Sequence, residues 1–410
     1  MSAGGGDIAG GIVRDMRTNL VKLGGAARID RGVETTPELD IVIDSGAPVA
    51  IGVSGGKDSC ACALATVDHL DRVGHHGPRI LIHADLGRVE WRDSAPTCER
   101  IAKVTGLELV TVRRQAGDMM DRWLTRWSNN VARYAALSCV KLILPWSTPS
   151  MRFCTSELKS AVMASALVKR YSGSYPGTTI LSASGIRRAE SGARSKAPTF
   201  KPNPRLKSAK HHTIGLDWNP IAAWSTPDVF AYLAARGFAL HEAYTRYGNS
   251  RVSCAFCIMG SEGDLVASTT CADNAAIYRE MCDLEIVSSF AFQGDRWLGD
   301  VAPHLLSEAQ IQGLACAKRA AAKRQAIEAR IPKHLLYVKG WPTVMPTRDE
   351  AVMLSEVRRE VATILDLGPR ITCTDPDSIL GRYADLMAQA RAKGRGVPIV
   401  DDTDEEADVL

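Results

Sequence analysis

The chain has 410 residues, of which 45% are hydrophobic and 23% are charged, and its formal net charge is +4. These values are close to globular averages, and no apolar run approaches the roughly 20 residues that cross a bilayer, which excludes a membrane-spanning protein. No signal-peptide pattern opens the chain, so we expect a soluble, cytoplasmic protein whose eleven cysteines are reduced.

The order of apolar and amphipathic segments predicts the fold. Residues 1–47 are polar and Gly-rich, with one amphipathic stretch at 12–23, and form an N-terminal extension. Strand-like and helix-like segments then alternate, with strands expected at 48–55, 79–87, 107–114 and 178–187 and helices at 60–73, 95–106 and 157–171. This alternation predicts an α/β, Rossmann-like fold: a parallel twisted sheet with helices on both faces and ligands at the carboxyl ends of the strands.

The remaining boundaries follow from changes of composition. The α/β domain is expected to span 48–250, followed by a cysteine-rich loop region at 251–285, an α-helical C-terminal region at 286–400 and an acidic tail at 401–410. A Ser or Thr N-cap, an early Pro and a final Gly predict a helix at 225–237. Amphipathic patterns predict two more helices, at 307–330 and 347–368.

The turn after the first strand has the composition of a phosphate site. In the stretch "VAIGVSGGKDSC", Gly55 and Gly56 lack the Cβ atoms that would keep backbone N–H groups from a polyanion, and a helix N-terminus follows. Lys57 supplies a mobile charge, Ser54 and Ser59 supply hydroxyl groups, and Asp58 is a candidate ligand for Mg²⁺. The spacing is not that of a Walker A loop.

All six positions resemble the Ser-Gly-Gly-x-Asp-Ser pyrophosphate loop (PP-loop) of the N-type ATP pyrophosphatases, whose fold is of the adenine nucleotide alpha-hydrolase type. That superfamily includes the sulfonucleotide reductases and the small subunit of ATP sulfurylase. The resemblance implies that ATP is cleaved between its α- and β-phosphates. AMP would pass to an acceptor, and pyrophosphate would remain on the loop.

Three later segments resemble the phosphoadenylyl-sulfate (PAPS) reductase-like branch, and the likeness extends over about residues 48–260. The segments are "HADLG" (83–87), "SGIRRAESGAR" (184–194) and "NPIAAWSTPDVFAYL" (219–233). The resemblance places Asp85 near the nucleotide sugar and base, and Gly185, Arg187, Glu190 and Arg194 at the nucleotide. The two arginines can bind phosphate or sulfate in a planar, bidentate manner, and Glu190 can fix one of them.

The segment 187–212 carries eight Lys or Arg residues. Besides the two arginines assigned to the nucleotide, these are Arg188, Lys196, Lys201, Arg205, Lys207 and Lys210. Such a group could follow a nucleic-acid backbone, since phosphate contacts need charge without base reading. A solvated loop fits the six residues equally well, and both interpretations stay open.

The cysteines offer a candidate metal site. Cys254 and Cys257 form a C-x2-C pair, which supplies half of a site. The arrangement resembles the DNA phosphorothioation sulfurtransferases of the same branch, in which one upstream and one later cysteine complete the set. That resemblance implies a [4Fe–4S] cluster on Cys154, Cys254, Cys257 and Cys271. Cys139 or Cys282 could replace Cys271, and a structural zinc or no metal are the alternatives.

Three functions are consistent with the sequence. The first is ATP-dependent adenylyl transfer followed by sulfur transfer, with a cysteine desulfurase as a possible donor and DNA, tRNA or a metabolite as the acceptor. The second is a sulfonucleotide (PAPS or adenylyl-sulfate) reductase that releases sulfite, and the third is a non-catalytic nucleotide-binding scaffold. We favour the first, because only it needs a pyrophosphate pocket and because the chain lacks the C-terminal Glu-Cys-Gly-(Ile/Leu)-His segment of the reductases.

Overall fold

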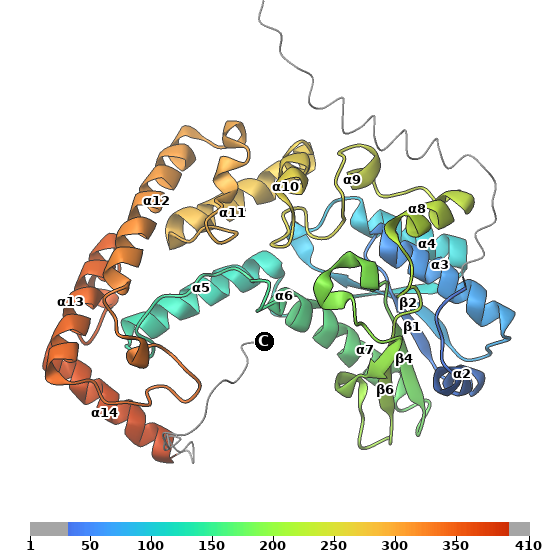
Figure 1. Ribbon diagram of the computed structural model, residues 1–410, viewed down its shortest axis with the longest axis horizontal. Coiled ribbons are helices and arrows are strands. Elements are labelled where there is room, and N and C mark those ends of the chain that lie inside the picture. Colours follow the sequence, from blue (N-terminus) through green and yellow to red (C-terminus); the bar gives the residue numbers. More distant parts are fainter. Residues whose placement is uncertain (1–31, 393–410) are drawn as a thin grey trace, which may run out of the picture. The chain divides into compact units, whose positions relative to one another are not determined.

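The structure is a computed structural model that describes residues 32–392 (Figure 1). These residues form two compact units: the sheet unit, residues 32–119 and 152–275, and the helical unit, residues 120–151 and 276–392. The helix predicted at 12–23 and the acidic tail at 401–410 lie outside the described residues. Of the helices between residues 32 and 392, none has the length and apolarity that crossing a bilayer requires.

The sheet unit is built on six strands in the order β3-β2-β1-β4-β6-β5. All neighbouring strands are parallel except β5, which is antiparallel to β6. The strands are β1 (Val49–Gly52), β2 (Arg79–Asp85), β3 (Glu108–Arg113), β4 (Thr179–Ala183), β5 (Phe200–Pro202) and β6 (Ile214–Trp218). The predicted parallel sheet is confirmed. The sequence did not indicate β5 and β6, which lie within and just after the basic segment.

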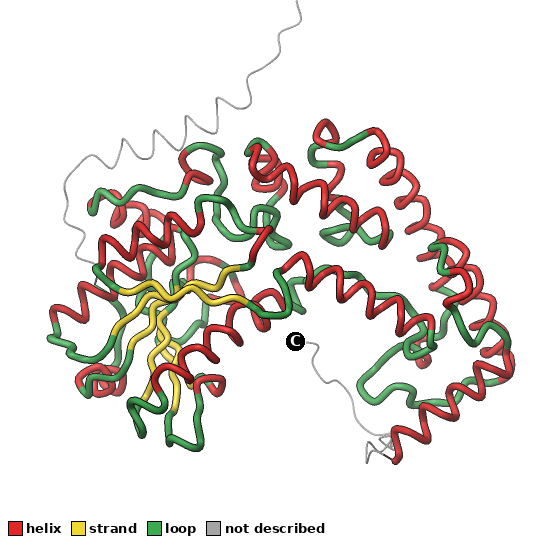
Figure 2. Tube along the Cα trace, turned by 180° about the vertical axis from the view of Figure 1, so that it is seen from behind, coloured by secondary structure: helices red, strands yellow, loops and turns green. Residues whose placement is uncertain are grey.

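The central strand β1 is buried on both faces, which explains its continuous apolar sequence. Val49 and Ile51 belong to one core cluster, and Ala50, which points to the opposite face, belongs to the other. Helices therefore cover both faces, as Figure 2 shows. The first cluster draws on α2 (Pro37–Asp44), α3 (Lys57–Arg72), α4 (Ser94–Thr105) and α8 (Thr226–Ala235), and the second on α7 (Ala161–Tyr171).

Three shorter helices complete the sheet unit: α6 (Phe153–Thr155), α9 (Glu242–Thr245) and α10 (Glu262–Thr269). The helix predicted at 225–237 corresponds to α8, where Ser225 and Asp228 form a reciprocal capping box. In α2, Leu39 and Ile43 are fully buried in the first core cluster. The core of this unit therefore begins before residue 48, inside the stretch that the sequence assigned to an extension.

The helical unit contains α5 (Met119–Ala135), α11 (Ala275–Ser288), α12 (Glu308–Glu328), α13 (Arg348–Ile364) and α14 (Pro376–Ala392). Its core joins residues 120–151 to the C-terminal helices. The ring of Trp146 lies 5.2 Å from those of both Trp123 and Phe292. The fully buried Arg358 donates to the carbonyl oxygens of Tyr134 and Ala135 at 2.9 and 3.1 Å. Residues 120–151 thus pack with the helical region, a difference from the sequence-based boundary of 48–250.

Two isoleucines of α2 test whether this helix is part of the core. Ile43 is 1% exposed and Ile41 is 70% exposed. We expect Ile43→Ala to lower the free energy of unfolding by about 2–4 kcal/mol, because it leaves a cavity against the sheet, and Ile41→Ala to change it by less than about 0.5 kcal/mol. Chemical denaturation followed by circular dichroism measures both variants. Equal losses would show that α2 does not belong to the core.

Candidate active site

Two adjacent strands end at the site. β1 and β4 are parallel neighbours with Ile51 opposite Ala183, and their carboxyl ends lead into residues 53–56 and 184–190. The chain continues from β1 to β2 on one side of the sheet, whereas β4 lies on the other side. A crevice at such a topological switch point is where open α/β sheets bind ligands.

The first wall of the site is residues 54–59, here called the glycine turn. Gly55 has φ +75°, a left-handed conformation that favours glycine. A Cβ atom on Gly185, in the loop after β4, would lie 2.6 Å from the carbonyl oxygen of Asp58, so only glycine fits there. Gly56 is the N-cap of α3 and provides no side-chain hydrogen bond to the first turn of the helix. A helix N-terminus whose own N-cap residue supplies no side-chain cap favours an anion.

The serine hydroxyls shape the turn from within. The Ser59 hydroxyl accepts the N–H of Ser54 at 3.2 Å and donates to the carbonyl oxygen of Gly56 at 2.9 Å. The Ser54 hydroxyl lies 3.4 Å from that of Ser59. Both predicted serines therefore lie in the turn, where they hold its backbone in shape.

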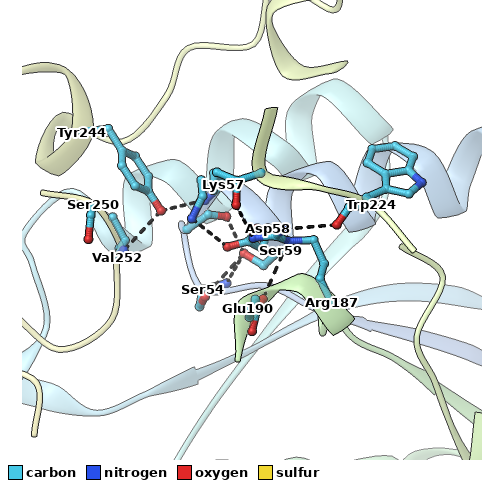
Figure 3. Close-up of polar contacts among 12 residues, drawn as sticks. Ser54, Lys57, Asp58, Ser59, Arg187, Glu190, Trp224, Tyr244, Ser250 and Val252 are labelled. Carbon is cyan, nitrogen blue, oxygen red and sulfur yellow. Dashed lines mark hydrogen bonds and ion pairs between the residues drawn. The ribbon is translucent and has the colours of Figure 1, made fainter. Parts of the chain in front are cut away.

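Two cations share the carboxylate of Asp58 (Figure 3). One carboxylate oxygen lies 3.0 Å from the Lys57 ammonium nitrogen, and the other accepts from Nε of Arg187 at 2.7 Å. The Lys57 and Arg187 side chains are 6% and 2% exposed. Arg187 also donates to the carbonyl oxygen of Trp224 and to the hydroxyl of Thr226, both at 3.2 Å. The ion pairs join the loop after β1 to the loop after β4.

Glu190 holds the second predicted arginine. Its carboxylate forms an ion pair with Arg194 and lies 3.8 Å from Nε of Arg187. Burial lowers the pKa of Arg194, and the charges of Arg152 and Arg251 lower it further. The structure thus brings two more arginines to the site, and the sequence analysis missed both.

Tyr244, on α9, connects the glycine turn to the segment before the cysteine pair. Its hydroxyl oxygen accepts the backbone N–H groups of Lys57 at 3.1 Å and of Val252 at 3.2 Å (Figure 3). Burial raises the pKa of Tyr244, which keeps the phenol neutral. The ammonium nitrogen of Lys57 lies 5.5 Å from the centre of this ring and 5.8 Å from that of Phe230. Tyr244 and Phe230 thus enclose Lys57 in an aromatic pocket.

A buried histidine supports the turn from behind. Nδ1 of His241 accepts the N–H of Ala243 at 3.0 Å, and a Cβ atom on Gly55 would lie 3.2 Å from the ring. Burial lowers the pKa of His241 to about 4, and the charge of Arg100 adds to this effect against the opposing charge of Asp93. His241 is therefore neutral at physiological pH.

His83 lies beneath the turn, where its Nδ1 is 3.0 Å from the carbonyl oxygen of Val53. Although burial favours the neutral ring, hydrogen bonds to Cys98 and Glu90 raise the pKa of His83 to about 10. Asp85, at the end of β2, accepts the N–H of Gly87 at 2.7 Å and a guanidinium N–H of Arg113 at 2.8 Å. One oxygen of Asp85 thus holds the turn after β2 and the other binds the end of β3, and its predicted place near the nucleotide sugar stays a prediction.

Among the four predicted cysteine ligands, Cys254 interacts with Cys257 and with Cys154. Burial raises the pKa of Cys254, the charges of Cys257 and Cys154 raise it further, and that of Lys159 opposes them. Cys271 instead forms a side-chain hydrogen bond with Tyr247. Among the residues that the structure describes, no three Cys, His, Asp or Glu side chains are grouped so as to hold a metal ion. As placed, the thiols do not fit a four-cysteine cluster, and that ligand set stays a prediction.

The two alternative fourth ligands belong to the helical unit. Cys139 is buried there, and Cys282 is buried beside Tyr278 and Glu285. Burial raises the pKa of both thiols, as expected for packing residues.

The basic segment divides into paired and exposed residues. Arg188 forms a two-pronged ion pair with Glu34, at 2.6 and 2.7 Å, and donates to the carbonyl oxygen of Ala197. Arg188 is therefore held inside the sheet unit, contrary to the interpretation that it follows a nucleic-acid backbone. Lys201 lies 4.0 Å from Asp217. The other members are exposed: Lys196, Arg205, Lys207 and Lys210.

Comparison with known proteins places these residues in a family. The sequence-family model of the phosphoadenosine phosphosulfate reductase domain matches residues 48–259. Among solved structures, the chain is similar to phosphoadenylyl-sulfate reductase from Candida auris in its phosphate complex (12% identity, TM-score 0.33, covering 62% of this chain and 98% of that one). It is also similar to the U34-tRNA thiolase NcsA from Methanococcus maripaludis with its [4Fe-4S] cluster (12% identity, TM-score 0.27, covering 76% and 80%). No curated protein matches the chain.

His241 makes the stability of the protein depend on pH. Its pKa is about 4 in the folded protein and about 6.5 in an unfolded chain, so the unfolded state binds more protons between these values. The stabilisation is complete above pH 6.5 and is lost as the pH falls towards 4, by up to about 3 kcal/mol. We expect His241→Asn, which keeps an acceptor for the N–H of Ala243, to weaken this dependence. Denaturation of both proteins at pH 4.5 and 7.5 measures it, and equal pH slopes would contradict the assignment.

Proposed function

Because the chain belongs to the phosphoadenosine phosphosulfate reductase domain family, we propose that it cleaves ATP to AMP and pyrophosphate, adenylylating an acceptor that then receives sulfur. One observation carries this proposal: the glycine turn leads into the N-terminus of α3, where the N-cap residue Gly56 supplies no side-chain cap and Lys57 and Arg187 lie beside it. Backbone amides and two buried cations suit a polyphosphate better than a single anion.

The first step is a displacement at the α-phosphorus of ATP. An acceptor oxygen forms the new bond to this phosphorus, the bond to the oxygen that bridges the α- and β-phosphates breaks, and pyrophosphate leaves with that oxygen. Negative charge therefore grows on the departing pyrophosphate, beside Lys57 and the amides of the turn. Arg187, fixed by four polar contacts, and Arg194, fixed by Glu190, are placed to neutralise the α-phosphate. Catalysis would rest on position and charge.

Asp58 acts on these cations. Both of its oxygens are engaged, one by Lys57 and one by Arg187, so in the free protein it orients the two side chains. The sequence suggested it as a ligand for Mg²⁺. In our proposal the ion arrives within the MgATP substrate, held by phosphate oxygens, as is common for Mg²⁺ at nucleotide sites.

The second step is sulfur transfer. A persulfide on one cysteine attacks the activated acceptor atom through its outer sulfur, and the bond from that atom to the AMP oxygen breaks, so AMP leaves with the oxygen. A second cysteine thiolate then attacks the inner sulfur, which leaves the outer sulfur on the acceptor and forms a disulfide between the two cysteines. An external dithiol reduces this disulfide for the next cycle. The candidate thiols to receive sulfur from a donor such as a cysteine desulfurase are Cys254 and the two cysteines that act on it, Cys154 and Cys257. No step is assigned to an iron–sulfur cluster or to zinc, because the thiols as placed do not fit one.

Sulfonucleotide reduction is the second candidate, and the matching family model favours it by its description. In that reaction a thiolate attacks the sulfur of the sulfonucleotide and the nucleotide phosphate leaves. A second thiol then releases sulfite as a disulfide forms. The glycine turn favours ATP cleavage over this reaction, because a sulfonucleotide has no pyrophosphate that the turn could bind.

Lys57→Met tests the proposal, because it keeps the stem between the rings of Phe230 and Tyr244 and removes the charge. We expect wild-type protein with MgATP and an acceptor to release pyrophosphate, and the variant to do so at least about 100-fold more slowly. Lys103→Ala, at an exposed position of α4, is the control and should keep full activity. Sulfite released from phosphoadenylyl sulfate in place of pyrophosphate would establish the reductase, and neither product would favour a scaffold.

The close contact at Gly185 supplies an independent test. A Cβ atom there would meet the backbone of Asp58 at 2.6 Å, whereas one on Gly192, in the same connection, would meet nothing within 4 Å. We therefore expect Gly185→Ala to displace the glycine turn and weaken ATP binding at least about tenfold, and Gly192→Ala to bind ATP normally. Isothermal titration with a non-hydrolysable ATP analogue measures both. Equal affinities for the two variants would mean that the turn does not hold the nucleotide.

A further inference from the structure

A groove along one side of α5 has no part in the chemistry proposed above. Its volume is about 520 Å³, which is in the range of small-molecule sites, and the residues that line it all belong to the helical unit. Its walls are α5 and the segment that joins α13 to α14. The lining includes Trp127, Val131, Ala132, Ala135, Arg370 and Thr372.

Small side chains make this side of α5 hollow. Ser128, Ala132 and Ala136 follow one another at intervals of four residues, so they lie on one face of the helix. The indole of Trp127 lies at one end of the groove, where it packs edge to face against Phe290 with 6.0 Å between the ring centres. From Trp127 to Ala136 the helix rises by about 13 Å, which is the length of the groove.

The opposite end of the groove is fixed by Thr372. Its backbone N–H and its hydroxyl both donate to the carbonyl oxygen of Ala135, each at 2.9 Å. These two bonds join the segment after α13 to the last turn of α5. Arg370, which precedes Thr372 by two residues and is exposed, lines the groove at this end. The groove therefore has an apolar end at Trp127 and a cationic end at Arg370.

Positive charge gathers at the cationic end. Arg358, which is fully buried, donates to the carbonyl oxygen of Ala135 at 3.1 Å, and Arg382 donates to that of Ala136 at 3.1 Å. Between residues 32 and 392, no carboxylate forms an ion pair with Arg358, Arg370 or Arg382. Carbonyl dipoles carry only partial charges, so three full positive charges lack a counter-ion at contact distance. An anion bound at this end is therefore stabilised.

We propose that this groove binds an amphipathic organic anion. The acidic group lies at Arg370, whose planar guanidinium suits carboxylate, sulfonate or phosphate oxygens. The apolar body lies against Val131 and Ala132 and extends toward Trp127, and the rise of the helix limits its length to about 13 Å. The site belongs to the helical unit alone, so it does not depend on the reaction proposed at the glycine turn.

Fluorescence of a model ligand tests the groove in the full chain. Anilinonaphthalene sulfonate carries one negative charge on an aromatic body and emits strongly when it leaves water, and phenylnaphthylamine has the same body without the charge. The test variants are Arg370→Gln, which removes the cation, and Ala132→Met, which fills the groove from an exposed position. The controls are Arg319→Gln and Ala322→Met, the same substitutions at exposed positions of α12.

We expect the wild-type protein to bind the sulfonate saturably, at one molecule per chain, and the uncharged probe at least about tenfold more weakly. Arg370→Gln should weaken sulfonate binding about tenfold and bring the two probes to similar affinities, because the charged contact is lost. Ala132→Met should weaken the binding of both probes, because the new side chain occupies the place of the apolar body. Both controls should match the wild type within about twofold.

Several results would overturn the proposal. These are the absence of saturable binding, equal affinity of the wild-type protein for the two probes, wild-type affinity in either test variant, or the same loss in a control. Both test positions are exposed, so the substitutions leave the core intact, and circular dichroism of each variant verifies this. Arg370→Gln keeps the space of the groove and Ala132→Met keeps its charge, so the two variants test the two halves of the site separately.

Discussion

The site depends on one carboxylate that two buried cations share. Asp58 opens α3, and Arg187 belongs to the loop after β4, so their ion pair fixes the ends of two neighbouring strands relative to each other. Lys57 lies on the other oxygen of the same carboxylate. Removal of Asp58 would leave the buried Lys57 without its ion-pair partner and the buried Arg187 with only the 3.8 Å contact to Glu190, which is far more costly than the loss of an exposed pair. In the free protein, the carboxylate of Asp58 thus holds in place the two positive side chains that a polyphosphate would contact.

The sequence predicted the parts of the fold and site that are encoded locally. A glycine-rich turn between an apolar strand and an amphipathic helix is recognisable because its function needs adjacent residues. The strands β1, β2 and β4 are recognisable because burial on both faces requires continuous apolar runs. The sequence could not predict which residues of distant segments meet at the site. Tyr244 meets Lys57 across 187 positions of the chain, and nothing in its local sequence distinguishes a tyrosine that caps a turn from one that packs in a core.

The same limit explains the other differences. The strands β5 and β6 are short, and β5 carries exposed residues of the basic segment, so charge hid the strand pattern. Residues 120–151 are rich in tryptophan, which indicates burial but not the partner; the partner is the C-terminal helical region. The cysteines show the converse case. The resemblance implied four cysteine ligands and left the fourth open, whereas in the structure Cys254 is influenced by Cys257 and Cys154 and Cys271 interacts with Tyr247.

The phenol of Tyr244 links the glycine turn to the segment that precedes the cysteine pair. Its single oxygen receives one amide from the turn and one from the strand of chain that leads to the cysteine pair. Because each amide is shielded from water, parting from the phenol costs about 1–3 kcal/mol unless another acceptor takes its place. A phosphate oxygen arriving in the turn is such an acceptor. A nucleotide that accepted the amide of Lys57 would leave Tyr244 bonded to Val252 alone, so occupancy of the turn would alter the anchorage of the segment that leads to the cysteine pair.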